Sequence, residues 1–333
     1  MNNFWQKLER PIMVLAPMAN VTDAAFRHII AKYGKPDVMW TEFVSADGLA
    51  LAPEAGRKKL LKDLEYSEAE RPIVAQFFTS SPEHMKGAAE LMAKLGFDGV
   101  DINMGCPDKS VEKQGAGASL MRNVSLAREL VKAAKEGAPN LPISVKTRTG
   151  YSRPDLENWL PEILKEDPAI VTIHARTRKE MSKEPTRWEF VRRAVEIRNQ
   201  CQDNILTKTL IVGNGDVKDL EEARMRVEET GCDGVMLGRA IFGNPFLFSE
   251  KKCLEGIEGL KLRLEVLVEH TKLFEKLLGA YKNFAIMKKH FKAYVTGFDG
   301  AGDLRVKLMD TNNASEVEAV VNDFLLYYSH ESR

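Results

Sequence analysis

One cysteine stands where a catalytic group would be placed. Cys106 lies between Gly105 and Pro107, in a loop that directly follows the apolar run DGVDIN, and Asn103 precedes it by three residues. A structural cysteine is expected inside an apolar run, as for Cys232, rather than in a turn. A loop cysteine at the rim of a site can act as a nucleophile or as a general acid, and spacing alone leaves both roles open. We expect Gly105 and Pro107 to give this turn an unusual backbone.

Polar residues follow other apolar runs in the same way. In a barrel of parallel strands, residues at the carboxyl ends of the strands face the active site. A lysine there, such as Lys146 in SVKTR, is costly unless it meets an anion or a polar ring. Beside a flavin it can stabilise the negative charge of the reduced ring. Together the residues at these positions outline a flavin site: Pro17, Met18, Ala19, Glu42, Gln76, Asn103, Cys106, Lys146, Arg148, His174, Arg176, Asn214, Gly215, Asp216, Gly238 and Arg239.

Several of these residues have a plainer alternative. Lys146 could lie on the surface beyond its strand, and His174 could be a hydrogen-bonded core histidine. In TIHARTR, however, Arg176 and Arg178 follow His174 and can reach a polyanionic substrate while the histidine bonds a cofactor. Gln76 both donates and accepts, which suits the edge of an isoalloxazine ring, but a polar residue filling the barrel would look the same.

Two glycine-containing loops suggest a phosphate site. GNGD at 213–216 and GRA at 238–240 follow the last two apolar runs. Loops after the seventh and eighth strands of a barrel commonly bind phosphate through backbone N–H groups, and Arg239 would add a charge-assisted contact. Either loop alone could be a tight turn. Their occurrence after consecutive strands favours phosphate binding.

Eight short apolar runs alternate with helix-like segments. Because the runs are nearly continuous in Val, Ile, Leu and Met, we expect strands buried on both faces. Eight such units in about 240 residues predict an α/β fold, a (β/α)8 TIM barrel. An open doubly wound sheet is less favoured because no GxGxxG follows the first run. Ser81-Pro82 and Asn123 predict helix starts, and Gly96 and Gly137 predict helix ends. The runs are 12–17, 37–43, 72–78, 98–103, 142–148, 169–175, 209–215 and 233–239.

From about residue 255 the pattern changes to helices without intervening strands. We therefore predict a barrel domain over 1–248 and a C-terminal all-helical domain over 255–333.

The composition restricts the class of protein. The 333 residues contain 44% hydrophobic and 29% charged residues, as in soluble globular proteins. No apolar run approaches the roughly 20 residues of a membrane helix, and the N-terminus lacks the layout of a signal peptide. The scattered cysteines suggest neither a metal site nor disulfides, so a cytoplasmic location is expected, with no membrane association and no obligate protein partner. The cysteines are Cys106, Cys201, Cys232 and Cys253.

At this point the motifs resemble those of the tRNA-dihydrouridine synthases. The likeness rests on APMANVTDAAFR, NMGCPDKSVEKQGAGASLM, SVKTRTG, IHARTR, VGNGDV and GVMLGRAIFGNPF, which occur in the family's order from residue 16 to about 246. The later MKKHFKAYVTGFDGA resembles the family's C-terminal helical domain. The resemblance implies an FMN-dependent enzyme that uses NADPH to reduce the C5=C6 bond of particular uridines in the D-loop of tRNA.

The resemblance also implies residue roles. Cys106 would donate the proton, and Asn103 and Arg148 would hydrogen-bond the uracil. FMN would be held by Pro17, Met18, Ala19, Gln76, Lys146, His174, Asn214, Gly215, Asp216, Gly238 and Arg239. The stretch KEMSKEPTRW departs from the family's pattern near the substrate mouth, with Ser182 where a Tyr is common, so it leaves open which uridine is modified.

The formal charges of 48 basic and 48 acidic residues cancel, so the molecule has no overall positive charge to attract RNA. RNA binding would therefore need a local basic patch. Five lysines and no acid lie between Lys276 and Phe298, including Lys288 and Lys289, and Arg176 and Arg178 belong to a second basic segment. Ordinary solvated faces would look similar, but two such patches beside one mouth predict an RNA track. Two alternatives remain: an FMN barrel that acts on a small molecule, like dihydroorotate dehydrogenases or ene-reductases, and a barrel that binds tRNA without chemistry.

Overall fold

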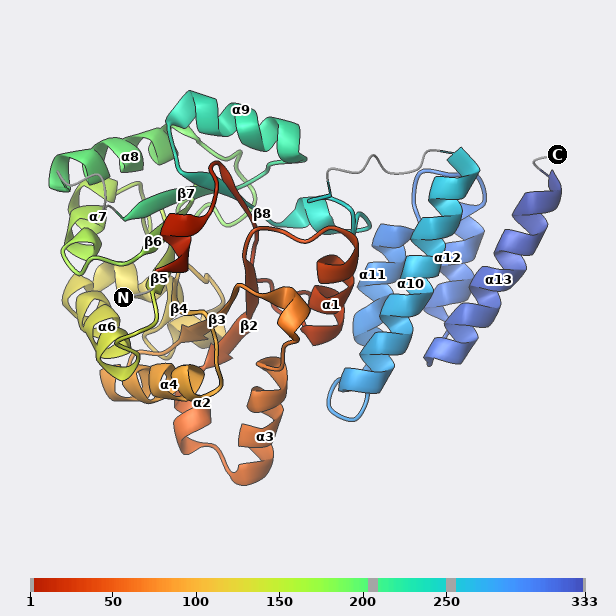
Figure 1. Cartoon of the computed structure of the whole chain (residues 1–333), viewed down its shortest axis with the longest axis horizontal. Coiled ribbons are helices and arrows are strands. Elements are labelled where there is room, and N and C mark those ends of the chain that lie inside the picture. The colour runs from red at the N-terminus through yellow and green to blue at the C-terminus, as the bar shows by residue number, and fades with distance from the viewer. Residues whose placement is uncertain (1–2, 203–208, 250–255, 332–333) are drawn as a thin grey trace.

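Eight parallel strands form the centre of the molecule (Figure 1). The computed structural model describes residues 3–202, 209–249 and 256–331. Neighbouring strands pair in the order β1-β8-β7-β6-β5-β4-β3-β2, and an isolated parallel bridge between Val14 and Val38 brings the first strand against the second. The predicted TIM barrel is confirmed. The strands are β1 Ile12–Leu15, β2 Met39–Ser45, β3 Ile73–Phe78, β4 Gly99–Met104, β5 Ile143–Arg148, β6 Ile170–His174, β7 Leu210–Asn214 and β8 Gly234–Leu237.

Helices surround the barrel (Figure 1). Ser81 and Asn123 cap helices through their side chains, as predicted, by accepting hydrogen bonds from the backbone N–H groups of His84 and Leu126. Gly96 has a φ of +77° just past its helix, as a helix-ending glycine should. Gly137 is different: it is the last residue of α6, and a Cβ there would lie 2.2 Å from the Lys86 carbonyl oxygen, so it serves helix packing. The helices are α1 Ala24–Tyr33, α2 Ala46–Leu51, α3 Glu54–Asp63, α4 Pro82–Lys94, α5 Lys109–Glu112, α6 Val124–Gly137, α7 Leu156–Leu164, α8 Glu189–Cys201 and α9 Leu220–Thr230.

The described residues after 255 form helices, as the sequence predicted. They are α10 Gly256–Leu278, α11 Met287–Tyr294, α12 Ala301–Met309 and α13 Ala314–Glu331. Figure 1 shows them as a bundle beside α1. Residue 255, where we place the start of the second domain, lies outside the described residues, as does Cys253. None of the helices that the structure describes is long and apolar enough to cross a membrane.

Helix α1 belongs to two hydrophobic cores. Phe26 and Ile30 pack in the core shared by the strands and the barrel helices. Ala25 and Ile29, on the neighbouring face, pack with buried residues of α10 to α13 such as Leu267. The two parts of the chain are therefore joined through the first helix of the barrel.

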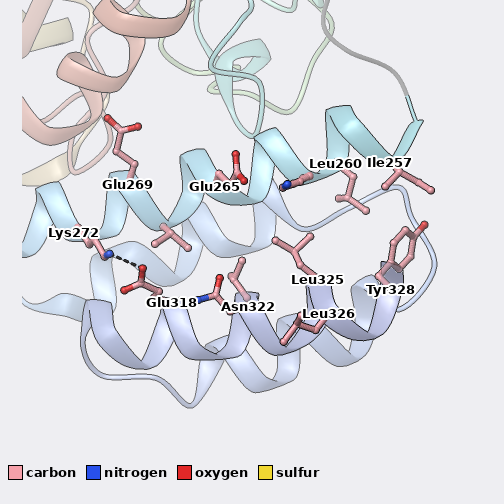
Figure 2. A pocket seen from close by; sticks show the side chains of 13 residues that line it. Ile257, Leu260, Glu265, Glu269, Lys272, Glu318, Asn322, Leu325, Leu326 and Tyr328 are labelled. Atoms are coloured by element: carbon pink, nitrogen blue, oxygen red, sulfur yellow. Dashed lines mark hydrogen bonds and ion pairs between the residues drawn. The ribbon is translucent and has the colours of Figure 1, made fainter. Parts of the chain in front are cut away.

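A hollow of about 800 Å³ lies within the helical bundle, between α10 and α13 (Figure 2). Leu260 and Leu325 line its apolar end, and an ion pair between Lys272 and Glu318, 2.6 Å from nitrogen to oxygen, lies at the other end. None of the predicted site residues lines it. The chemistry must therefore be sought at the barrel.

Candidate active site

The strand register brings the predicted residues to one end of the barrel. Asn103 of β4 lies opposite Lys146 of β5, and Arg148 lies opposite His174 of β6, which in turn lies opposite Asn214 of β7. All are at or near the carboxyl ends of their strands, where barrel enzymes place their sites.

A cavity of about 280 Å³ opens at this end. Every residue predicted to bind a cofactor lines it except Ala19 and Gln76. Gln76 is fully buried one layer deeper in the barrel. The complete lining is Ala16, Pro17, Met18, Lys146, His174, Arg176, Ser182, Asn214, Gly215, Asp216, Val217, Met236, Gly238 and Arg239.

Lys146 is held by a side-chain amide. Its Nζ donates to Asn214 Oδ1 at 3.2 Å, and Asn214 Nδ2 donates to the Met236 carbonyl oxygen at 2.7 Å. Burial, together with the positive charge of Arg148, lowers the pKa of Lys146 to about 8. The ammonium group therefore remains mostly charged at neutral pH. Its positive charge is only partly balanced by neighbouring groups, so binding an anion beside it is favourable.

A carboxylate lies between two arginines at the cavity wall. Asp216 pairs with both Arg176 and Arg239, and their charges hold its pKa below the ordinary value even though partial burial acts in the opposite direction. Arg176 is only 3% exposed, whereas the side chain of Arg239 is 66% exposed. Arg176 thus forms part of the cavity wall, and its guanidinium is held by Asp216.

His174 lies beside these cations and is neutral. Burial lowers its pKa well below the ordinary value, and several positive neighbours lower it further, Lys146 most strongly among them. The next turn depends on Gly215, whose φ is +135°; a Cβ there would lie 2.3 Å from Thr186 Cγ2. The Gly215 carbonyl oxygen accepts a hydrogen bond from Trp188 Nε1 at 3.2 Å. The loop after β7 is therefore rigidly placed.

The turn that carries Cys106 is organised by Asn103. Asn103 Oδ1 accepts hydrogen bonds from the backbone N–H groups of Cys106 at 2.9 Å and of Gly105 at 3.1 Å. Gly105 does not have a positive φ, so the turn uses no left-handed glycine. A Cβ at this position would lie 3.2 Å from the Thr147 carbonyl carbon, so the turn packs tightly against β5. Burial raises the pKa of the Cys106 thiol, so the thiol is protonated at neutral pH.

The buried Arg148 connects this turn to the loop after β6. Its Nε donates to the Gly105 carbonyl oxygen at 2.8 Å, and its Nη1 donates to the carbonyl oxygens of Thr177 at 3.0 Å and Met181 at 3.2 Å. Arg178 pairs with Glu112 of α5 and is partly exposed. The two arginines therefore fix the segment that borders the cavity.

Known proteins resemble this chain along nearly its whole length. Residues 14–327 match the family described as Dihydrouridine synthase (Dus). A probable tRNA-dihydrouridine synthase 2 of Bacillus subtilis is 40% identical over 327 residues, which cover 97% of this chain and 96% of that protein. A probable tRNA-dihydrouridine synthase of Staphylococcus aureus is 39% identical over 327 residues, covering 97% and 95%. The chain belongs to the dihydrouridine synthase family.

Solved structures agree on the fold. Histamine dehydrogenase from Rhizobium sp. 4-9 superposes with a TM-score of 0.53 at 14% identity, over 76% of this chain and 48% of that one. The chain is thus an enzyme of the dihydrouridine synthase family, built on a TIM barrel.

The cavity fits a flavin that ends in a phosphate. Lys146, Arg176 and Arg239 bring three positive charges to it, against the single carboxylate of Asp216. A Cβ at Gly238 would meet only ordinary contacts beyond 3.6 Å, which leaves the backbone of this loop accessible. A phosphate is the group that such a set of donors prefers.

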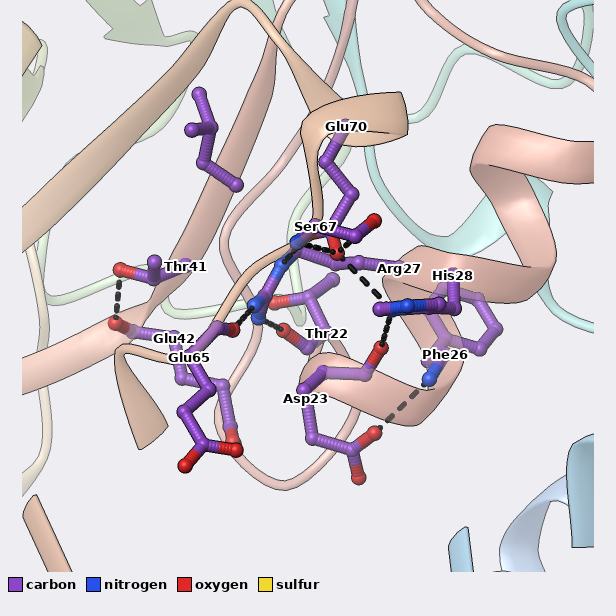
Figure 3. A network of polar contacts seen from close by, with 12 residues as sticks. Thr22, Asp23, Phe26, Arg27, His28, Thr41, Glu42, Glu65, Ser67 and Glu70 are labelled. Carbon is purple, nitrogen blue, oxygen red and sulfur yellow. Dashed lines mark hydrogen bonds and ion pairs between the residues drawn. The ribbon is translucent and has the colours of Figure 1, made fainter. Parts of the chain in front are cut away.

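The loop after β1, which carries Pro17 and Met18, is anchored by a buried ion pair (Figure 3). Thr22 Oγ1 accepts from the Met18 backbone N–H at 3.0 Å. Arg27, on α1, donates through Nη1 to the Thr22 carbonyl oxygen at 2.7 Å and pairs through Nε with Glu70 at 2.7 Å. Arg27 and Glu70 are both fully buried. This pair therefore supports one wall of the cavity.

The predicted basic patch of the helical part is partly occupied by acids. Lys282 pairs with Glu42, which lies in the middle of β2, and with Asp63 of α3, the latter at 2.9 Å. Lys288 and Lys289 lie on α11, and Lys289 is half-buried near the Glu42 carboxylate. Lys282 thus joins the bundle to the barrel, and Lys288 and Lys289 remain candidates for RNA contact.

Sequence reasoning missed one charged residue of the site. Asp101 of β4 is buried and hydrogen-bonded to Gln76 and Ser144, its register partners on β3 and β5. The sequence contained the information needed to find it. Asp101 is a carboxylate inside an apolar run and precedes Asn103 by two residues, so the two side chains must point to the same face of the strand. Among the described residues, no group of three or more histidines, cysteines and carboxylates is arranged to hold a metal ion.

Proposed function

We propose that this enzyme reduces the C5=C6 bond of uridines in the D-loop of tRNA, with FMN as its bound flavin and NADPH as the reductant. When bound, the flavin supplies the hydride for C6 of the uracil. The curated relatives at about 40% identity are named as tRNA-dihydrouridine synthases and align over 97% of the chain. Their names favour tRNA over a small molecule as the substrate.

The residues of the cavity would hold FMN by charge and by accessible backbone. Arg239, Gly238 and Gly215 would bind its phosphate end, with Asp216 orienting Arg239. Lys146 would lie where the ring accumulates negative charge, and its lowered pKa means that binding an anion is favourable there. His174, being neutral, would serve as a hydrogen-bond partner that adds no charge.

Cys106 would donate the proton to C5 of the uracil. A donor must be protonated before the reaction, and burial raises the pKa of this thiol. As Sγ gives up its proton, Lys146 and Arg148 stabilise the thiolate, which then regains a proton from solvent. Asn103 and Arg148 would hydrogen-bond the uracil, and the target base must first leave the RNA stack to reach them.

The Cys106 turn beside the cationic cavity carries this proposal. A cysteine whose backbone N–H is held by Asn103, between Gly105 and Pro107 just after β4, is placed for chemistry, because a structural cysteine needs no such turn. Arg178, Lys288 and Lys289 would contact the tRNA backbone near the mouth, and Arg176 would act through the Asp216 pair.

The test replaces the thiol. In Cys106→Ala we expect flavin to remain bound while single-turnover formation of dihydrouridine by the pre-reduced enzyme slows at least about a hundredfold, the usual contribution of a general acid. The exposed Cys201→Ala is the matched control and should react at the wild-type rate. An unchanged rate in Cys106→Ala would remove the thiol from the mechanism.

Two further experiments test the substrate and the cofactor. Mapping dihydrouridine in tRNA from cells lacking the protein would identify the uridine that is modified. A colourless purified protein would contradict the proposal that a flavin is bound.

A further inference from the structure

A chain of hydrogen bonds runs through the barrel from Asp101 to the Cys106 turn. Gln76 Nε2 donates to Asp101 Oδ2 at 2.5 Å, and Asn103 Nδ2 donates to Gln76 Oε1 at 3.0 Å. Asn103 Oδ1 then accepts from the Cys106 backbone N–H at 2.9 Å. Gln76, Asp101 and Asn103 are all buried, so solvent provides no alternative partner.

The direction in which these hydrogen bonds are donated follows from Asp101, where the chain begins. An ionised carboxylate only accepts, so Gln76 must turn its NH₂ group toward Asp101 and its oxygen toward Asn103. Asn103 must then present its NH₂ group to Gln76, which leaves its oxygen for the N–H groups of Gly105 and Cys106. A reversed Asn103 would place an NH₂ group against two backbone donors, leaving all of them unsatisfied in a buried place.

We propose that Asp101 is a positioning residue that fixes the orientation of the Gln76 and Asn103 amides and thereby the turn that presents Cys106. Its side chain bonds to Gln76 and Ser144, and its negative charge also acts on Lys146 of the cavity lining. Its path to the Cys106 turn runs through Gln76 and Asn103. The proposal rests on the proposed function in one respect, that Cys106 is the group whose placement matters for the reaction.

Ser144 offers a matched control. Its Oγ donates to the other carboxylate oxygen, Asp101 Oδ1, and it bonds to neither Gln76 nor Asn103. Ser144→Ala therefore removes a bond to Asp101 while leaving the chain toward Cys106 intact. Asp101→Leu removes the acceptor, whereas Asp101→Asn can still turn an amide oxygen toward Gln76.

The first measurement avoids the reaction altogether. Alkylation of Cys106 by iodoacetamide, followed at its own peptide by mass spectrometry in the flavin-loaded protein, reports the placement and exposure of the thiol. We expect alkylation to be at least threefold faster in Asp101→Leu than in the wild type, because the turn loosens. Asp101→Asn and Ser144→Ala should stay within twofold of the wild type. A folded Asp101→Leu with wild-type alkylation would refute the positioning role.

The second measurement is the single-turnover rate. Misplacing a reacting group by about 1 Å can slow a reaction about a hundredfold, so Asp101→Leu should be ten to a hundred times slower, with Asp101→Asn restoring most of the rate. If Asp101→Asn is as slow as Asp101→Leu, the negative charge matters and the orientation does not, and the proposal fails. If Asp101→Leu does not fold, Gln76→Met interrupts the same chain and must give the faster alkylation.

These outcomes separate the two proposals. Should Cys106→Ala react normally, the proposed function loses its acid, yet the alkylation experiment still decides whether Asp101 positions the turn. Should Asp101→Leu leave alkylation unchanged while Cys106→Ala is inactive, the acid stands and the positioning role is lost.

Discussion

Removing Arg27 should destabilise the enzyme strongly and in a pH-dependent way. In Arg27→Met the fully buried Glu70 loses the guanidinium that lies 2.7 Å away, and the carbonyl oxygens of Thr22 and Glu65 lose their donor (Figure 3). Leaving one partner of a buried ion pair uncompensated costs about 3–5 kcal/mol. For a chain of this length the entropy of unfolding is about 0.7 kcal/mol per kelvin, so the melting temperature should fall by about 4–7 °C at pH 7.

The sign of the pH dependence follows from Glu70. In the wild type, burial alone would raise the pKa of Glu70, but Arg27 and the hydrogen bonds from its neighbours hold it below the ordinary value of 4.5. Its stabilising contribution is therefore present above pH 4.5 and is lost as the pH falls through the folded-state pKa. Without Arg27, Glu70 keeps only His28, at 3.0 Å, and the bonds from Ser67, so burial dominates and the folded-state pKa rises above 4.5. The variant's penalty is then greatest at neutral pH and shrinks as Glu70 takes up a proton.

Differential scanning calorimetry of the flavin-loaded protein at pH 7 and pH 5 tests this. Arg193→Met is the matched control, because Arg193 pairs with Glu157 and Glu196 on the surface and should contribute less than about 1 kcal/mol. A loss in Arg27→Met no larger than in Arg193→Met would refute the reasoning. So would a loss that is equal at the two pH values.

Two further predictions concern binding. In Gly215→Ala the added Cβ would lie 2.3 Å from Thr186 Cγ2 at a φ of +135°, so FMN should bind at least tenfold more weakly, measured by flavin fluorescence. Gly302→Ala, with nothing within 4 Å, is the control that should keep the wild-type affinity; equal affinities in the two variants would contradict the phosphate loop. The double variant Lys288→Ala with Lys289→Ala should bind tRNA more weakly, with a smaller slope of log K against log salt in a filter-binding series. An identical slope would exclude both lysines from the RNA track.

The fold could be predicted closely because the strands are buried on both faces. Each predicted run overlaps one strand, with ends that differ by at most about two residues, since apolar residues continue to the edge of the barrel. Gly137 does end α6, as predicted, but a glycine at a helix end and a glycine at a helix crossing look alike in sequence, so its second role in packing was not seen. The crossing with α4 depends on tertiary packing, which local pattern does not contain.

The sequence predicted which residues form the site, but not which of them are joined in ion pairs. Strand ends identified Lys146, His174 and Asn214, because parallel strands bring such ends together. The sequence could not show that Arg176 is buried against Asp216, or that Lys282 is paired with Glu42, because these partners are 40 and 240 residues apart. A basic residue in a basic run gives no sign of a distant acid.

Because α1 packs in both hydrophobic cores, it determines how chimaeras of this enzyme with its relatives should be built. The chain changes character near residue 255, which invites an exchange of everything after that point. Such an exchange would place a foreign bundle against Ala25 and Ile29, which are packed for the native one. The same helix carries Arg27, which fixes the loop of Met18, so a mismatch at the graft would be transmitted to the cavity that Met18 lines. The transferable unit is therefore the helical bundle together with α1, although some two hundred residues separate them in the sequence.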